Sequence, residues 1–446
     1  MSTTRRDFCM LGAAAGAALL AGCGGGASSD ATGSDATATA EAGVFEPSLD
    51  ADTEASFTVI SDYENFEALD AAVLGFQELY PNVNITHEHL DDFASNVEQR
   101  ITSDPTVGMA LLASYHLNDT TGTLVDNLVD LSAGDSGVNL SGVDENAYAA
   151  CYVDDKLPYV PLWFREIGIV ANTTLLEGEG LEVPTTYQEF CDCCDALIAA
   201  GYVPVQGHPQ NIQYFFTPYG MNYLHNEATD EQFAAIRDGE EGSTVVVDDV
   251  FQMAFDFLDK GYYTKEAMDR YEDYYDNAIL TFFEGDVPFL VATSDTVSGM
   301  AKRESKSEAF SANPFEYSFN YTPLGEKAPV EYVDTDAGFG LSANCECLDV
   351  ATEFFNYCYS TDVLNQFGQI KGKPTTAKED TGELYAALGD LPEGYVCYAW
   401  DFDDPVRTVE YALCDTIRPI IIGEVTTLEE AEAKMVEEAL AHANSD

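Results

Sequence analysis

Each of the two tryptophans in the chain lies close to a charged side chain. Trp163 is followed two residues later by Arg165, and Trp400 is followed directly by Asp401. An indole ring stacks on the apolar face of a sugar, and a guanidinium or carboxylate forms hydrogen bonds with the sugar hydroxyl groups. The two pairs therefore indicate a binding site for a hydroxyl-rich ligand. They also fit tryptophans that fill space in a core, so both interpretations stay open.

Further candidate ligand-binding residues lie at the ends of apolar runs or in a stretch rich in aromatic residues. Three follow the run 57–61, one follows the run 287–292, and two open the aromatic stretch 214–219. These candidates are Asp62, Tyr63, Glu64, Asp295, Tyr214 and Phe215. Aromatic clusters are also typical of a core, and acidic residues are common throughout this chain.

The chain is strongly acidic. Its 446 residues include 79 Asp and Glu against 19 Lys and Arg, which gives a formal net charge of -60. This charge repels phosphate backbones, so we exclude nucleic acid as a partner. Neutral and cationic ligands remain open, and an acidic site with aromatic walls would also suit a polyamine. Adaptation to high salt is a further explanation of the charge.

The sequence contains no recognisable catalytic motif. It lacks a Gly-x-Ser-x-Gly elbow, a phosphate-binding P-loop and a His-Glu-x-x-His zinc helix. A glycosidase needs two placed carboxylates, and no pair stands out among 79 acidic residues. His87 and His89 share one face of a predicted strand, where histidines without a metal are the commoner case. We predict that the protein is not an enzyme and holds neither a cofactor nor a metal.

The N-terminus has the pattern of an export signal. Residues 1–22 begin with the basic pair Arg5 and Arg6 and continue with an apolar run at 9–20 and then small residues. Because Phe8 follows the pair after one residue, the start resembles a twin-arginine signal.

The export signal is followed by an anchor motif. Residues 20–23, Leu-Ala-Gly-Cys, resemble a bacterial lipobox, in which Cys23 becomes the lipidated first residue of the mature chain. An ordinary cleavage site is the alternative. Two or more acyl chains, such as palmitate, anchor a protein firmly. Residues 23–56 then have the composition of a disordered tether. We predict an extracytoplasmic protein, anchored to the outer face of the cytoplasmic membrane.

The 11 cysteines add one constraint. Cys9 is removed with the signal and Cys23 is lipidated, so an odd number remains and at least one thiol is unpaired or pairs with another molecule. Three cysteines follow helical spacing within 186–200, and we predict buried core thiols there in preference to a metal site. These are Cys191, Cys193 and Cys194.

Hydrophobic periodicity predicts alternating strands and helices in the first part of the body. Strands are expected at 57–61, 83–90 and 109–114, with helices at 67–80 and around 93–101. A series of this kind predicts a parallel sheet covered by helices, with ligands at the carboxyl ends of its strands. Tyr63 follows one of those ends.

A second α/β series begins with a predicted strand at 167–172. The helix that follows has a capping-box pattern, Thr186 with Glu189. The final helix of the chain has the same pattern in Thr427 and Glu430.

Several short segments carry a resemblance to a known family. They include Phe-Gln-Glu-Leu-Tyr-Pro at 76–81, Phe-Glu-Gly at 283–285 and Lys-Gly-Lys-Pro-Thr at 371–375. In their shared order over about residues 57–441, these segments resemble the extracellular solute-binding proteins of ABC transporters, the maltose-binding-like family 1. No single segment is specific.

The resemblance implies a fold as well as a family. The fold is α/β and two-lobed, periplasmic-binding-protein-like, with hinge-linked lobes and a ligand cleft between them. Tyr63 stands where the family often has Trp, and residues 294–296 depart from its usual Gly-Ser-Trp loop, so the ligand stays open. The expected boundaries are 57–165 and 295–370 for lobe one, and 166–294 and 371–446 for lobe two.

The resemblance also implies a transport role. The chain would be the substrate-binding protein of an ABC importer, capturing an extracellular mono- or oligosaccharide by lobe closure. It would deliver this ligand to a membrane permease that works with a cytoplasmic ATPase, and it would act as a monomer. A polyamine or other small solute is the alternative ligand. A tethered surface hydrolase or adhesin is the alternative of a different class.

Overall fold

A computed structural model of the chain describes residues 43–113, 116–117, 123–153, 155–240, 242–378, 396–398 and 404–443. The predicted export signal, the lipidation residue Cys23 and most of the predicted tether lie outside the described residues. Two of the predicted ligand-binding residues, Trp400 and Asp401, also lie outside them.

The first lobe is built on a five-stranded sheet with the order β2-β1-β3-β10-β4. Its parallel part confirms the predicted β-α-β-α-β series, because β1 pairs in parallel with both β2 and β3. The later strand β10 adds to β3 in the antiparallel direction and also pairs with β4. The strands are β1 (Ala55–Ser61), β2 (Val83–His89), β3 (Val107–Leu112), β4 (Val160–Pro161) and β10 (Gly338–Leu341).

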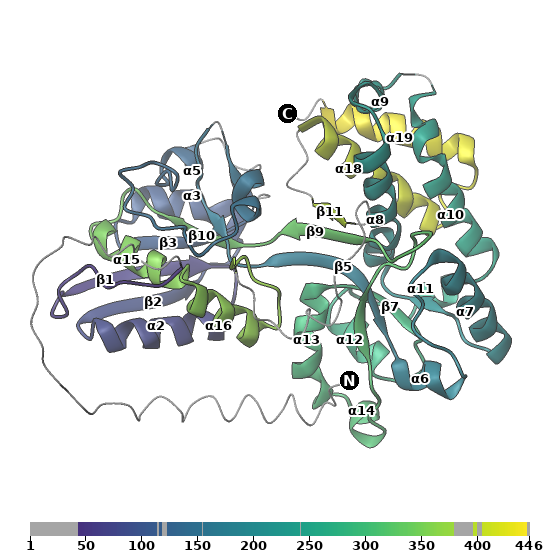
Figure 1. The fold of residues 1–446 in the computed structure, drawn as a ribbon, viewed down its shortest axis with the longest axis horizontal. Helices are drawn as coiled ribbons and strands as arrows, with labels where there is room; N and C mark the ends of the chain where they lie inside the picture. The colour runs from purple at the N-terminus through teal and green to yellow at the C-terminus, as the bar shows by residue number, and fades with distance from the viewer. Residues whose placement is uncertain are drawn as a thin grey trace, which may run out of the picture. The chain divides into compact units, whose positions relative to one another are not determined.

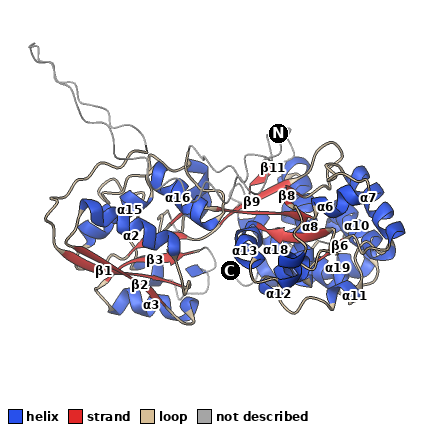
Figure 2. Cartoon of the chain, turned by 90° about the horizontal axis from the view of Figure 1, so that it is seen from below, coloured by secondary structure: helices blue, strands red, loops and turns tan. Residues whose placement is uncertain are grey.

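Helices cover both faces of this sheet, with α2 and α16 on one side and α3 on the other (Figures 1 and 2). In α2, residues spaced three and four apart, such as Leu69, Ala72 and Phe76, are fully buried, as the helical periodicity predicts. Pro81 follows shortly after its end. The described helices of this lobe are α2 (Glu67–Leu79), α3 (Phe93–Ser103), α5 (Thr123–Asp126), the 3₁₀ helix η1 (Glu145–Cys151), α15 (Leu348–Cys358) and α16 (Thr361–Lys371).

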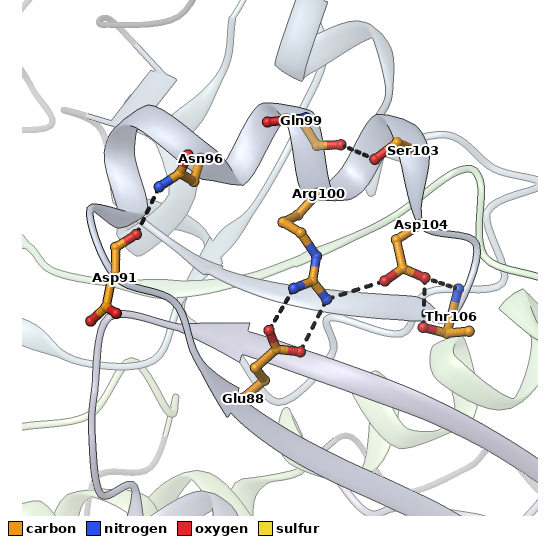
Figure 3. Close-up of polar contacts among 8 residues, drawn as sticks. All are labelled: Glu88, Asp91, Asn96, Gln99, Arg100, Ser103, Asp104 and Thr106. Atoms are coloured by element: carbon orange, nitrogen blue, oxygen red, sulfur yellow. Dashed lines mark hydrogen bonds and ion pairs between the residues drawn. The ribbon is translucent and has the colours of Figure 1, made fainter.

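An ion-pair network fixes the end of α3 against β2 (Figure 3). The guanidinium of Arg100 donates to Glu88 of β2 at 3.0 Å and to Asp104, just beyond the helix, at 3.1 Å. Asp104 also accepts hydrogen bonds from the backbone and the hydroxyl of Thr106, at 3.0 and 2.7 Å. The turn that leads from α3 into β3 is therefore held by side chains that lie close to it in the sequence.

The second lobe is built on a six-stranded sheet with the order β11-β9-β5-β7-β6, in which β8 pairs with β5. The central strand β5 is antiparallel to β7, β8 and β9. Along one edge of β5, the first half pairs with β9 and the second half with β8. The strands are β5 (Phe164–Ala171), β6 (Val205–Gln206), β7 (Phe289–Thr293), β8 (Ser318–Tyr321), β9 (Glu331–Thr335) and β11 (Val396–Tyr398).

The helices of the second lobe pack around an aromatic core. The predicted capping box of Thr186 and Glu189 is present at the start of α7, and Cys191, Cys193 and Cys194 of this helix are buried free thiols, as predicted. The hydroxyl of Thr427 accepts from the backbone of Glu430 at 3.2 Å, which confirms the predicted cap of α19. The helices are α6 (Thr173–Gly178), α7 (Tyr187–Ala200), α8 (Pro209–Glu227), α9 (Asp230–Arg237), the 3₁₀ helix η2 (Ser243–Val247), α10 (Asp248–Asp259), α11 (Lys265–Met268), α12 (Asp276–Phe282), α13 (Ser294–Glu304), α14 (Glu308–Ala312), α18 (Asp404–Ile421) and α19 (Leu428–Ala443).

Strand pairing places two segments in a different lobe from the one expected. Residues 295–336 were assigned to lobe one, but β8 and β9 pair with β5 of the second sheet. The chain crosses to the first sheet only after β9. Conversely, residues 373–377 lie against the first lobe, since Ala377 bridges to Val143.

The predicted tether also ends earlier than expected. Residues 43–54 are packed on the first lobe, with the ring of Phe45 edge-on to Tyr357 at 5.2 Å between ring centres. Thr361, the first residue of α16, donates its backbone N–H to the carbonyl of Gly43 at 2.8 Å. The backbone N–H of Ser48 donates to the buried carboxylate of Glu353 at 2.6 Å. The packing of the Phe45 ring and the hydrogen bond between Ser48 and Glu353 therefore order this stretch in spite of its polar composition.

Among the described residues, no helix combines the length and the apolar character that crossing a bilayer requires.

Candidate ligand-binding site

In the described part of the chain, three segments pass side by side between the two sheets. Residues 162–164 lead from β4 into the start of β5, residues 336–337 connect β9 to β10, and residues 373–376 lie against them. The backbone N–H of Asp336 donates to the carbonyl of Trp163 at 3.1 Å. The first segment forms one further backbone hydrogen bond of 3.0 Å with the second segment and one of 3.0 Å with the third. Side chains on these segments are therefore held at the junction of the two lobes.

A buried ammonium group lies at the centre of this junction. The side chain of Lys373 is 2% exposed, and its Nζ lies 2.6 Å from Oδ2 of Asp336. The same Nζ forms an ion pair with Asp295, at the start of α13, and lies 4.9 Å from the ring centre of Trp163. The indole N–H of Trp163 donates to the same oxygen of Asp336 at 2.7 Å. One lysine thus joins residues from three separate parts of the chain.

The charges of this pair are stabilised by each other. Burial alone would lower the pKa of Lys373 and raise the pKa of Asp336. Burial is the largest single effect, but the attraction between the two groups outweighs it together with Asp295 and Tyr63 on the lysine side and with Arg165 and the backbone N–H of Ala337 on the aspartate side. The pKa of Lys373 therefore lies well above its ordinary value and the pKa of Asp336 below its own. Both groups are ionised at neutral pH.

A second ion pair lies on the adjoining strands of the second sheet. Arg165 of β5 is the direct neighbour of Asp334 on β9, and its Nη2 donates to Oδ2 of that residue at 2.6 Å. The buried Nε of Arg165 has no hydrogen-bond acceptor among the described residues. Tyr214 of α8 is half-buried, and the charge of Arg165 partly offsets the rise that burial causes in the pKa of Tyr214. This side of the junction offers a donor, an acceptor and an aromatic ring.

The first lobe contributes a tyrosine ring with a lysine on it. Tyr63 directly follows β1 and Asp62, and its half-buried ring lies edge-on to Phe66 at 5.1 Å between ring centres. Nζ of Lys371 lies 4.5 Å from the centre of the Tyr63 ring. Burial lowers the pKa of Lys371, and the charge of Lys373 lowers it further. Burial among protein atoms raises the pKa of Asp62, although its side chain reaches solvent.

We call these ten residues the crossing cluster. Its members interact electrostatically across the junction: Tyr63 with Lys373, Asp336 and Asp295, and Arg165 with Tyr214 and the same carboxylates. The members are Asp62, Tyr63, Trp163, Arg165, Tyr214, Asp295, Asp334, Asp336, Lys371 and Lys373. Carboxylate acceptors, cationic donors and aromatic rings lie together in it. This combination can form hydrogen bonds with a ring of hydroxyl groups and pack on an apolar face.

Six of the ten residues predicted from the sequence lie in the crossing cluster, but not all in the expected manner. Trp163 is fully buried, with its ring against Phe66 and Phe367. It therefore packs beneath the other members of the cluster and exposes no ring face to a ligand. Phe215 lies in the core of the second lobe, with its ring centre 5.3 Å from that of Phe257, and we remove it from the candidate site. Glu64 is exposed next to the cluster.

Four members of the cluster were not predicted from the sequence. Asp334 and Asp336 lie two residues apart, one near the end of β9 and one just beyond it, and Gly338, the first residue of β10, follows. Lys371 and Lys373 belong to the Lys-Gly-Lys-Pro-Thr segment, one of those that carry the family resemblance. The signal that could have identified them is the pairing of scarce cations with acids at strand ends.

The two histidines considered as metal ligands have other neighbours. Nε2 of His87 lies 2.8 Å from the hydroxyl of Ser61, and Nδ1 of His89 lies 3.7 Å from Asp91. Burial lowers the pKa of His87. These contacts account for both side chains as parts of the first sheet and its edge.

The fold and the cluster define a class of protein: a two-lobed α/β protein of the periplasmic-binding-protein type, with polar and aromatic side chains gathered where the chain crosses between the lobes. The sequence signature of the bacterial extracellular solute-binding proteins matches residues 60–364. The chain therefore belongs to this family, which is a family of binding proteins and not of enzymes.

Solved structures with the same fold support this assignment. The raffinose complex of the solute-binding protein RafE has 16% sequence identity and a TM-score of 0.62, with 87% of this chain and 99% of that chain covered. A probable secreted solute-binding lipoprotein from Streptomyces coelicolor has 17% identity and a TM-score of 0.65, with 86% and 98% covered. The mannobiose complex of BlMnBP1, a binding protein of an ABC transporter from Bifidobacterium animalis subsp. lactis, has 14% identity and a TM-score of 0.61, with 91% and 97% covered.

A comparison with curated protein sequences found no match.

Proposed function

We propose that this protein is a lipid-anchored receptor that captures an extracellular mono- or oligosaccharide. It delivers the sugar to the permease of an ABC importer, which a cytoplasmic ATPase drives. The ligand is held at the crossing cluster by closure of the two lobes. In this proposal Cys23 carries the lipid, and the export signal directs the chain across the cytoplasmic membrane.

The observation that carries the proposal is the composition of the crossing cluster. Two ion pairs hold donors and acceptors in fixed positions: Lys373 with Asp336 near Tyr63, and Arg165 with Asp334 near Tyr214. Preorganised charged hydrogen-bonding groups beside an aromatic ring suit a ligand with many hydroxyl groups. Three of the solved structures with this fold are a raffinose complex, a mannobiose complex and a chitin oligosaccharide binding protein.

The charge of the cluster argues against a polyamine. Three cationic side chains, Arg165, Lys371 and Lys373, lie among its carboxylates. A polyamine would have to approach these cations at short range. A neutral saccharide would instead accept their hydrogen bonds.

Contacts between the lobes fit a closing mechanism. Lys302 of α13, in the second lobe, forms an ion pair of 3.0 Å with Glu67 of α2, in the first lobe. Both side chains are about half exposed, and such a pair contributes little free energy. It can therefore break and form at small cost, while a ligand that contacts both lobes shifts the population toward the closed form.

The experiment that tests the ligand class is a thermal-shift screen of the mature chain with Cys23→Ser, which removes the lipid. We expect a rise in the unfolding midpoint with a saccharide, since a ligand at 100 times its dissociation constant adds about 2.7 kcal/mol to stability. A rise with spermidine or putrescine alone would replace the carbohydrate proposal by the polyamine alternative. Hydrolysis of a glycoside by the purified chain would overturn the receptor role.

A matched pair of variants tests the site. Arg165→Gln removes the guanidinium from the cluster, and we expect at least tenfold weaker binding of the identified sugar, which is about 1.4 kcal/mol. Arg270→Gln is the control, because Arg270 also forms ion pairs in the second lobe, with Glu284 at 2.8 Å and Asp286 at 2.9 Å, but lies outside the crossing cluster. Equal affinities in both variants, measured by calorimetry, would exclude Arg165 from the site.

The anchor is tested separately in cells. We expect the wild-type chain to fractionate with membranes and to incorporate labelled palmitate, and the Cys23→Ser chain to do neither. Membrane association that survives the substitution would contradict the predicted lipidation.

A further inference from the structure

Outside the crossing cluster, three side chains with metal-binding atoms meet on the last two helices. Glu438 and His442 lie four residues apart on α19 and so share one face of that helix. Asp415 lies on α18, against which α19 packs (Figure 1). The arrangement combines one imidazole and two carboxylates from two neighbouring helices.

The distances are close to those of a coordination sphere. Nε2 of His442 lies 2.9 Å from Oδ2 of Asp415, and one ligand atom from each of the three residues lies within 4.8 Å of the others. Zinc binds such atoms at about 2.0–2.2 Å, which places ligand atoms about 3–3.5 Å apart in a tetrahedral site. Only a small approach of Glu438 is needed to complete three protein ligands.

The ion pair that Glu438 forms now can be given up for that approach. Glu438 forms an ion pair of 2.5 Å with Lys434, which also contacts Glu437 at 3.2 Å. Lys434 therefore keeps a carboxylate partner if Glu438 turns toward a metal. The ring of Tyr411 lies 5.5 Å from the ring of His442 and limits where that imidazole can point.

Solvent access and charge both favour entry of a cation. The side chains of Asp415 and His442 are 48% and 29% exposed, so an ion can reach the site and a water molecule can fill a fourth position. The net charge of -60 raises the concentration of cations near the surface.

We propose that Asp415, Glu438 and His442 form a binding site for a divalent transition metal, with Zn²⁺ as the best fit. An imidazole nitrogen with carboxylate oxygens suits zinc, whereas Ca²⁺ requires six to eight oxygen ligands. The bound ion joins α19 to α18. It thereby stabilises the packing of the C-terminal helix on the second lobe, because a ligand that binds only the folded state stabilises that state.

The test uses the mature chain with Cys23→Ser, stripped of metal with a chelator and titrated with ZnCl₂ in a calorimeter. We expect one zinc-dependent site, a higher thermal unfolding midpoint with Zn²⁺, reversal by EDTA and no such shift with Ca²⁺. Absence of zinc binding at protein concentrations of tens of micromolar would overturn the proposal.

Matched variants on α19 locate the site. We expect His442→Gln and Glu438→Gln each to weaken zinc binding at least about tenfold, as loss of a ligand or of its support does. Glu437→Gln is the control, since Glu437 is the neighbouring acid on the same helix and shares Lys434 with Glu438. Its zinc affinity should equal that of the parent chain. Lys434→Met should strengthen binding, because it frees Glu438.

The variants also separate this site from other zinc-binding groups in the chain. Zinc binding that is equal in the parent chain, His442→Gln and Glu438→Gln would assign the ion to other side chains, such as the thiols, and would overturn the proposal. All three glutamine variants should unfold at the same temperature as the parent chain in EDTA. A difference confined to zinc is then an effect on the metal site and not on folding.

Discussion

Two clusters in this molecule use the same components in different surroundings. Each holds one cation between two carboxylates: Arg100 between Glu88 and Asp104, and Lys373 between Asp295 and Asp336. The side chain of the arginine is 27% exposed, and that of the lysine is 2% exposed. The partners of Arg100 lie within 12 residues of it, whereas those of Lys373 lie 78 and 37 residues away. One network holds a single turn, and the other joins distant segments at the junction of the lobes.

The difference shows how position decides what an ion pair contributes. Water and salt screen a pair at the surface, which typically contributes up to about 1 kcal/mol. A buried pair gains little net stability over an apolar pair, but removal of one partner leaves an unpaired charge away from water. The Lys373 cluster should therefore be sensitive to single substitutions and tolerant of compensated ones, and the Arg100 cluster should be insensitive to both.

The largest effect is expected for Lys373→Met. The substitution keeps most of the length of the side chain but leaves the carboxylate of Asp336 without its buried cation, so the free energy of unfolding should fall by about 3 kcal/mol or more. Chemical denaturation in urea measures the change. The double variant Lys373→Met with Asp336→Asn should recover much of the loss, because the more buried carboxylate is then neutral, and the remaining one, Asp295, is 40% exposed and can be hydrated. A loss below about 1 kcal/mol in the single variant would place this cluster in the same class as the surface network.

An intermediate effect is expected for Asp336→Asn, and it should depend on pH. Burial raises the pKa of Asp336 in the folded protein, but Lys373, Arg165 and the backbone N–H of Ala337 together outweigh burial, so this pKa lies below its ordinary value. The unfolded chain, whose Asp pKa is about 3.9, takes up the proton first as the pH falls. The contribution of Asp336, about 2 kcal/mol for hydrogen bonds to a charged group, is therefore present above about pH 4 and lost as the pH falls through the lower folded pKa.

The measurement compares unfolding free energies of the parent and Asp336→Asn chains at pH 6 and pH 3. The gap between them should shrink at the lower pH. Trp163 gives an independent signal in a Trp400→Phe background, since its indole N–H donates to Asp336. A gap that stays constant with pH would mean that Asp336 has an ordinary pKa in the folded state.

The smallest effect is expected for Arg100→Met. Its partners Glu88 and Asp104 are 40% and 32% exposed, so water replaces the lost contacts, and the free energy of unfolding should fall by less than about 1 kcal/mol. The loss should shrink further in 1 M salt, where the screening length is about 3 Å. A cost that is above about 2 kcal/mol and independent of salt would remove the contrast between the two clusters.

Local features of the fold could be predicted from the sequence because they depend on near neighbours. The strand predicted at 57–61 is the core of β1, and the capping pair of Thr186 and Glu189 is present as expected. Both rest on periodicity or on hydrogen bonds across three residues. The two-lobed fold followed from the order of short segments in a resemblance.

The composition of the crossing cluster could not be predicted in the same way. Lys373 meets Asp336 and Asp295 only because three segments from distant parts of the sequence cross between the sheets. The lobe boundaries were displaced for the same reason, since β8 and β9 return to β5 before the chain crosses at Asp336. Phe215 was assigned to the site on residue type alone, and helix α8 turns it into the core.

The docking of residues 43–48 on the first lobe has a mechanical consequence for the proposed receptor. The chain enters the described body at Gly43, which is hydrogen-bonded to the start of α16, and Ser48 is bound to Glu353 of α15. Tension along a membrane anchor would enter the protein through these contacts and so reach the first lobe directly. The second lobe carries none of these contacts. The membrane anchor would therefore restrain the first lobe and leave the closing motion of the second lobe unhindered.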